Sequence, residues 1–153
     1  MTPAFQLKIA AFEYCNTYIS NRINTIEAVL KSLEESKNSE SKSSVGDKYE
    51  TGRAMIQLEE EKNKTQLSEA LTAKAVLENI KIERKSNQVE IGSFVITNSG
   101  PYFIAIGIGK IMIKNELIYS ISLESPIGQV LKNKQEGEEV VFNKKTIQIQ
   151  TII

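Results

Sequence analysis

Two acidic residues three positions apart, Asp47 and Glu50, lie in the segment Gly46-Asp47-Lys48-Tyr49-Glu50, between two long stretches of helical periodicity. A pair at the turn between two helices is open to solvent and has no walls that could orient a substrate. We therefore expect this pair to serve a recessed site that belongs to a partner.

The residues before this pair have the pattern of one long amphipathic helix. Only Asn16 interrupts the apolar stripe, and we interpret it as a structural residue that sets the register of a helix pair. Steps of four and three predict a helix that turns one narrow face toward a partner helix. The stripe consists of Phe5, Ile9, Phe12, Ile19, Ile23, Ile26, Leu30 and Leu33.

The segment 36–46 is rich in serine and lysine and has almost nothing apolar to bury, which predicts a loop or a frayed tip. Helical signal resumes from about Asp47 to Arg84, with Gly52 as the weak point near its start. We expect residues 1–85 to form an antiparallel, coiled-coil hairpin with an acidic tip near 44–52. Polar residues at 59–63 dilute the second stripe, so the outer part should be the less stable.

Residues 86–153 change to a period of two and are rich in β-branched side chains, which predicts a small β-rich domain. Strands are expected at 89–97, 102–108, 110–113 and 117–123, with a turn at 98–101. A closing hairpin is expected from 140–142 and 146–153 around Asn143-Lys144-Lys145. One short helix near 126–133 is predicted, because Ser125 is a good N-cap and Pro126 suits the first helical position. The fold class is therefore α+β.

Composition excludes several classes of function. The chain has 19 basic and 19 acidic residues, so no net charge draws it to nucleic acid or anionic membrane, and independent sequence-specific DNA binding is not expected. With no histidine and a single cysteine, Cys15, zinc sites and Ser-His or Cys-His catalysis are disfavoured. The apolar runs are far short of a bilayer span and the first residues carry no signal-peptide pattern, so a cytoplasmic location without membrane contact is expected.

These features together resemble the bacterial Gre transcript-cleavage factors. That family combines a long helical hairpin, Gly-Asp-x-x-Glu at its tip, and a small β domain carrying Ile-Ser-x-acid-Ser-Pro. The second signature here is Ile121-Ser122-Leu123-Glu124-Ser125-Pro126-Ile127-Gly128, continued by Leu131, Lys134 and Gly137. The resemblance covers nearly the whole chain in the same order, and it implies an FKBP-like fold for residues 86–153.

The resemblance also implies a function, that of a transcription elongation factor that is not a free-standing enzyme. The β domain would dock at the rim of the RNA polymerase secondary channel through Glu124, Ser125 and Pro126. The hairpin would reach the active centre, where Asp47 and Glu50 would help the polymerase hold a second Mg²⁺ and activate water. A backtracked transcript would then be cut. The factor would have no cofactor of its own and would contact nascent RNA only within the complex.

Simpler interpretations of the same residues stay open. Asp47 and Glu50 have the spacing of a capping box at a helix start, which needs no partner. Glu124, Ser125 and Pro126 are equally a solvated charge, an N-cap and a helix-starting proline.

The chain also departs from the family pattern. Gre factors commonly continue with Asn-Ala-x-Tyr after the acidic pair, where this chain has Thr51-Gly52-Arg53-Ala54. The alternative function is therefore a non-cleaving, polymerase-binding regulator of the same fold, and a coiled-coil adaptor unrelated to transcription is a weaker third.

Overall fold

A computed structural model describes the backbone of residues 2–43 and 47–153 and the side chains of residues 2–39 and 50–153. The chain consists of two long helices followed by a six-stranded mixed sheet with one short helix, which confirms the predicted α+β class. It divides into two compact units, one of residues 18–74 and one that joins residues 1–17 to residues 75–153. The predicted domain boundary at residues 85 and 86 stays a prediction.

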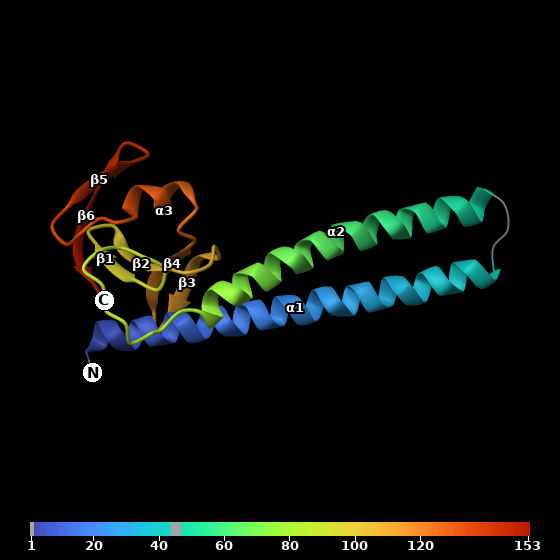
Figure 1. Cartoon of the computed structure of the whole chain (residues 1–153), viewed down its shortest axis with the longest axis horizontal. Helices are drawn as coiled ribbons and strands as arrows, with labels where there is room; N and C mark the ends of the chain where they lie inside the picture. Colours follow the sequence, from blue (N-terminus) through green and yellow to red (C-terminus); the bar gives the residue numbers. More distant parts are fainter. Residues whose placement is uncertain (1, 44–46) are drawn as a thin grey trace. The chain divides into compact units, whose positions relative to one another are not determined.

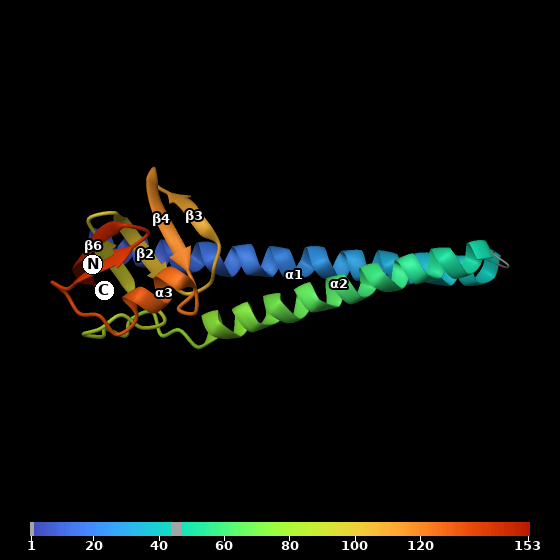
Figure 2. The ribbon, with the colours of Figure 1, turned by 90° about the horizontal axis from the view of Figure 1, so that it is seen from above.

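Unit 18–74 is an antiparallel helical hairpin made of parts of helices α1 (Pro3–Ser43) and α2 (Asp47–Glu78). The two helices run side by side in both views (Figures 1 and 2). Their seam buries Ile19, Ile23 and Ile26 of α1 and Ala70 and Asn63 of α2. At about 1.5 Å per residue, segment 18–43 of α1 is about 39 Å long.

The tip differs from the prediction of a loop at 36–46. Helix α1 continues to Ser43, and residues 44–46 lie outside the described residues. Extending a helix that has already formed adds one hydrogen bond per residue without a new nucleation cost, and the lysines and glutamates here are good helix formers. A polar composition therefore does not end this helix.

Helix α2 ends at Glu78 rather than near Arg84. The side-chain amide of Asn79 donates to the Ala75 carbonyl at 2.9 Å, and the Ile80 N–H donates to Leu77 at 3.1 Å in a tightened last turn. Such contacts satisfy carbonyls that would otherwise be orphaned at the helix end. The helical prediction for 79–84 is therefore wrong.

The sheet has the strand order β3-β4-β2-β1-β6-β5. The strands and the short helix are β1 (Phe94–Thr97), β2 (Gly100–Ile104), β3 (Gly109–Ile113), β4 (Glu116–Ile121), α3 (Pro126–Leu131), β5 (Glu139–Phe142) and β6 (Lys145–Ile152). Strand β2 pairs with β4 in parallel, and the other pairs are antiparallel. Strand β1 is shorter than predicted, because residues 89–93 turn at Gly92, whose φ is 95°. Strand β2 begins at Gly100, inside the predicted turn, and ends at Ile104 rather than at residue 108.

Each face of the sheet has its own cover within the second unit. On one face the Phe12 ring of α1 meets Phe103 edge to face, with ring centroids 6.5 Å apart, and Cys15 contacts Ser120. On the other face α3 packs over a core that includes Val95, Ile104, Leu131, Ile147 and Ile149. Figure 1 shows the start of α1 and α3 on opposite sides of the sheet.

The first turns of α1 do not bury the predicted stripe. The fully buried residues here are Lys8, Ala11 and Cys15, whereas Ile9, Phe12 and Asn16 are half-buried. The reason is that this part of α1 covers a flat sheet face, whose contact area is broader than the narrow seam of a helix pair. The Asn16 side-chain amide donates to the Phe12 carbonyl of its own helix at 3.0 Å.

Candidate functional site

The acidic tip lies at the start of α2. Asp47 is the first residue of the helix, and Glu50, in the same first turn, has an exposed side chain. The N-terminal end of a helix favours negative charge because its unpaired N–H groups carry partial positive charge. The side chains of Asp47, Lys48 and Tyr49 lie outside the described residues, as does Gly46, so the capping box and the metal-donor role both stay predictions.

The first turns of α2 remain helical through Thr51-Gly52-Arg53-Ala54, the residues that differ from the Gre sequence pattern. Glycine in a helix costs about 1 kcal/mol relative to alanine, so this start is weakened without being broken. Over the described side chains no group of three or more histidine, cysteine or acidic residues could hold a metal ion. Mg²⁺ takes more ligands than two carboxylates supply, so a tip with two carboxylates would need further ligands from a partner, phosphate or water.

A carboxylate further along α2 lies in the hairpin seam. Glu60 has a side chain that is 14% exposed, and its oxygens lie 3.8 Å from Lys37 of α1 and 4.0 Å from Lys64. Asn63, one turn on, is buried and donates to the Glu59 carbonyl at 2.8 Å. The sequence interpretation treated 59–63 only as a dilution of the stripe.

A signal for these two positions existed in the sequence. Steps of four and three connect Ile56, Glu60, Asn63, Leu67 and Ala70, the spacing of a helix-pair seam. Both Glu60 and Asn63 are polar, so a pattern of apolar residues alone does not reveal them. The cross-helix pair of Lys37 with Glu60 ties α1 to α2 within the outer half of the hairpin.

The predicted docking corner lies between β4 and α3. Ser125 is the N-cap of α3, as predicted, with Pro126 in the first turn. The Ser125 hydroxyl accepts from the Gly128 N–H at 3.0 Å and donates to the Ser122 carbonyl at 2.7 Å. Both its proton and an acceptor lone pair are therefore engaged within the corner.

The other two predicted contact residues are presented to solvent. Glu124 and Pro126 are both exposed. Among the residues with described side chains, no cation lies within ion-pair distance of the Glu124 carboxylate, while its backbone carbonyl accepts from the Gln129 side chain at 3.1 Å. The corner thus offers an unpaired carboxylate and a rigid proline ring, held in place by the Ser125 cap.

The glycine inside α3, Gly128, is required by the close approach of this helix to the backbone that precedes it. A Cβ at this position would overlap the Ser122 carbonyl oxygen and would lie 2.7 Å from the Leu123 carbonyl oxygen. Only a residue without a side chain allows α3 to approach the preceding backbone this closely. The motif therefore contains residues that build the corner, Ser125 and Gly128, and residues that face solvent, Glu124 and Pro126.

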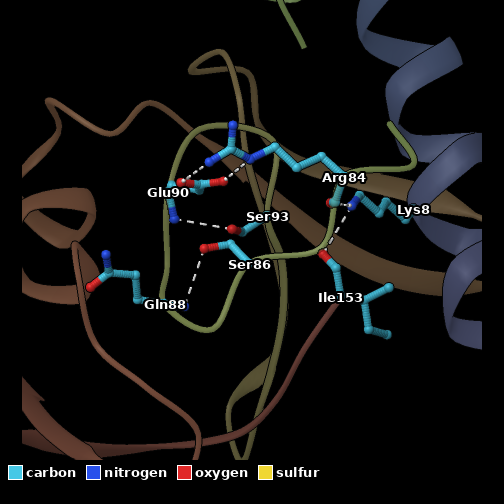
Figure 3. A network of polar contacts seen from close by, with 7 residues as sticks. All are labelled: Lys8, Arg84, Ser86, Gln88, Glu90, Ser93 and Ile153. Carbon is cyan, nitrogen blue, oxygen red and sulfur yellow. Dashed lines mark hydrogen bonds and ion pairs between the residues drawn. The ribbon is translucent and has the colours of Figure 1, made fainter. Parts of the chain in front are cut away.

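Lys8 of α1 is a buried cation that the sequence pattern does not single out. The Lys8 ammonium group donates to the Ile153 carbonyl at 3.0 Å and to the Arg84 carbonyl at 3.5 Å, as Figure 3 shows. Burial lowers the pKa of Lys8, and the charge of Glu90 acts in the opposite direction. Lys8 thereby joins α1 to the segment after α2 and to the end of β6.

A second buried contact joins α1 to the sheet. The Ser120 hydroxyl donates to the Ile106 carbonyl at 2.7 Å, so it accepts from the Cys15 thiol, 3.4 Å away. Burial raises the pKa of Cys15, which the hydrogen bond with Ser120 only partly offsets. Cys15 is therefore a neutral, structural thiol.

None of the described helices could span a lipid bilayer. Comparison with protein-family models gives no match to the chain, and comparison with curated proteins gives no match either.

Proposed function

We propose that this chain is an RNA polymerase-binding transcription elongation factor that stimulates cleavage of backtracked nascent RNA. The observation that carries the proposal is the placement of Asp47 and Glu50 in the first turn of α2, where a hairpin with helices about 39 Å long turns back. A reach of this length suits a site recessed inside a large partner. The Gre-like motifs at 46–50 and 121–128 support the choice of RNA polymerase.

Asp47 and Glu50 are three residues apart in a helix, a spacing that places two positions on one face. Two carboxylates match the number that Mg²⁺ commonly takes from protein when phosphate and water supply its other ligands. The ion, once bound, would lower the pKa of the attacking water and neutralise charge on the phosphate. The role of this chain is to bring the two carboxylates to the polymerase centre and hold them there.

Glu124 and Pro126 would contact the polymerase, with Ser125 positioning them as the N-cap of α3. Binding and chemistry are thereby assigned to different parts of the chain. Changes at the corner should affect affinity, and changes at the tip should affect cleavage.

A non-cleaving regulator is the second candidate, and the observation that favours it is Gly52. A glycine two residues beyond Glu50 leaves the helix start less rigid, and a loosely held donor is poorly placed for chemistry. Such a factor would occupy the channel without cutting RNA.

The test uses a stalled, backtracked elongation complex with Mg²⁺ and resolves the RNA lengths. Asp47→Ala combined with Glu50→Ala should abolish stimulated cleavage while retaining polymerase affinity within a few fold. The matched control, Glu61→Ala with Glu69→Ala, removes the same charge from exposed positions of α2 and should cleave like the parent.

A binding experiment with core polymerase completes the test. Glu124→Lys should weaken binding, whereas Glu83→Lys, the same change at another exposed glutamate, should not. A tip double variant that cleaves at the parental rate would refute the metal-donor role. A parent that binds polymerase but does not cleave would establish the regulator, and a parent that does not bind would exclude both.

A further inference from the structure

The sheet face that carries α3 displays a pair of stacked tyrosines. Tyr102 of β2 lies opposite Tyr119 of β4 in the parallel register, and their ring centroids are 5.0 Å apart at an interplanar angle of 24°. In the antiparallel pair of β3 with β4, Lys110 lies opposite Tyr119, and Met112 lies opposite Leu117. Cross-strand partners project from the same face of a sheet, so all these side chains share one surface.

A cavity of about 520 Å³ adjoins the tyrosine pair. Its apolar lining comes from Ile121 of β4, Ile127 of α3 and Phe142 and Ile147 of the closing hairpin. Ser99, Asn143 and Lys145 are its other lining residues. The volume lies within the range of pockets that hold a small ligand or a large side chain. All of these residues belong to the same compact unit.

Beyond the cavity the same face stays uncovered along β3 and β4. Met112 is 59% exposed and Leu117 is 38% exposed, although the two lie side by side. Adjoining apolar residues that reach solvent mark interaction surfaces more often than scattered ones do. Among the described residues, neither Tyr102 nor Tyr119 has a hydrogen-bond partner for its hydroxyl. Burial raises the pKa of Tyr102, so that this hydroxyl remains a donor.

The charged side chains that the strands themselves project from this face are lysines, whereas Glu124 lies at its margin, just before α3. Lys110 lies opposite Tyr119, and Lys145 lies opposite Phe142, which packs on the α3 side. The carboxylates of these strands, Glu116 and Glu139, alternate with residues of this face and project from the other one. Neither lysine forms an ion pair with any described residue. The surface is therefore apolar at its centre, with cations on two sides.

We propose that this face binds a short acidic segment of a partner protein. One apolar side chain of the segment enters the cavity beside Tyr119, and carboxylates on flanking residues pair with Lys110 and Lys145. The charge complementarity selects an acidic segment, and the aliphatic lining selects an apolar anchor. This surface is separate from the tip carboxylates, and its role does not depend on RNA cleavage.

Single-stranded RNA fits the same face less well. Base stacking requires an open aromatic ring, but Tyr102 is only 7% exposed and covers one side of Tyr119. The apolar walls of Ile121, Ile127 and Ile147 offer no donors or acceptors to base edges, and the polar groups of the lining are limited to Ser99, Asn143, Lys145 and the two tyrosines. Two lysines also provide little of the phosphate neutralisation that such binding needs.

The test measures binding of labelled synthetic peptides to the full chain by fluorescence anisotropy and maps the contacts by NMR shift changes. The probe is acetyl-Asp-Glu-Leu-Phe-Glu-Asp-amide. Controls replace Leu-Phe with Ser-Gly, or replace the four acids with lysine, and a third probe is a uridine oligomer. The acidic apolar peptide should bind in a saturable way with shift changes at Tyr119, Ile127 and Lys145, and each control should bind more weakly.

The protein variants are Lys110→Glu with Lys145→Glu, and Lys85→Glu with Lys132→Glu as a charge-matched control at exposed positions away from the cavity lining. The first pair should weaken the acidic peptide about tenfold at low salt, and the control pair by much less. The proposal would be overturned if both double variants bound the acidic peptide with equal affinity, or if the shift changes fell on other residues. Stronger binding of the uridine oligomer, or a dissociation constant of the acidic peptide above about 1 mM, would also overturn it.

Discussion

Replacing Gly128 with alanine tests whether the predicted docking corner depends on a close approach of two backbone segments. The new Cβ would overlap the Ser122 carbonyl oxygen and lie 2.7 Å from that of Leu123. Both obstacles are backbone atoms, so no side-chain rotation can relieve the contact. The Ser122 carbonyl also accepts from Ser125, hence a shift of the backbone would strain the cap as well.

The magnitude follows from two opposing effects. Overpacking of a closely packed site typically costs about 1–3 kcal/mol, and a clash with backbone belongs at the upper end. Alanine is better than glycine in a helix by about 1 kcal/mol, which offsets part of that cost. We therefore expect a net loss of about 2 kcal/mol. For a domain of roughly 60–100 residues this lowers the melting temperature by about 8–16 °C.

The assay is thermal unfolding followed by near-ultraviolet circular dichroism, which responds to packed tyrosines such as the stacked Tyr102 and Tyr119 of the sheet. The matched control is Gly107→Ala, because Gly107 is exposed and a Cβ there would meet nothing within 4 Å. This control should be neutral or slightly stabilising, since alanine restricts the unfolded chain. A Gly128→Ala protein that melts within about 2 °C of the parent would refute the backbone-contact explanation of this glycine.

Two further predictions concern buried groups at the base of α1. Cys15 is fully buried and its pKa is raised, so in the native protein this thiol should react with a disulfide reagent only as fast as the protein unfolds. A cysteine introduced at the exposed position 83, Glu83→Cys, should react rapidly and serves as the control. Prompt labelling of Cys15 would contradict the prediction. Burial lowers the pKa of Lys8 in the folded protein, so the folded protein releases the Lys8 proton at a lower pH than the unfolded chain does. Between the lowered pKa and the unperturbed value of 10.5, the free energy of unfolding of the parent should therefore rise with pH relative to that of Lys8→Met. Urea titrations of both proteins across this range measure the difference, and a difference that is constant or falls with pH would contradict the buried charge.

Local chemistry made several features predictable. The closing hairpin was predicted around Asn143-Lys144-Lys145, and the turn consists of Asn143 and Lys144, both with positive φ, while Lys145 already begins β6. Ser125 and Pro126 specify the start of α3 through one hydroxyl and one fixed φ angle. Each of these signals acts over a few residues and is therefore visible in the sequence.

The ends of the long helices were predictable only in part. Serines and lysines after residue 35 suggested a loop, but a helix that is already nucleated continues to Ser43. At the other helix the pattern ran on to Arg84, whereas α2 ends at Glu78 in a tightened turn in which the Ile80 N–H donates to the Leu77 carbonyl. Helix ends depend on small free-energy differences, which composition alone does not resolve.

Patterns along the chain establish the order of elements, the change from helical to alternating period, and the position of an acidic pair at the start of the second helix. Tertiary structure alone decided that the first turns of α1 cover a sheet face, that Lys8 and Cys15 are buried there, and that Gly128 lies against the backbone before α3. It also decided the parallel pairing of β2 with β4, which brings Tyr102 and Tyr119 together. The physical reason is range: periodicity and capping arise between near neighbours in the chain, whereas these contacts join residues that only the packed fold brings within reach of each other.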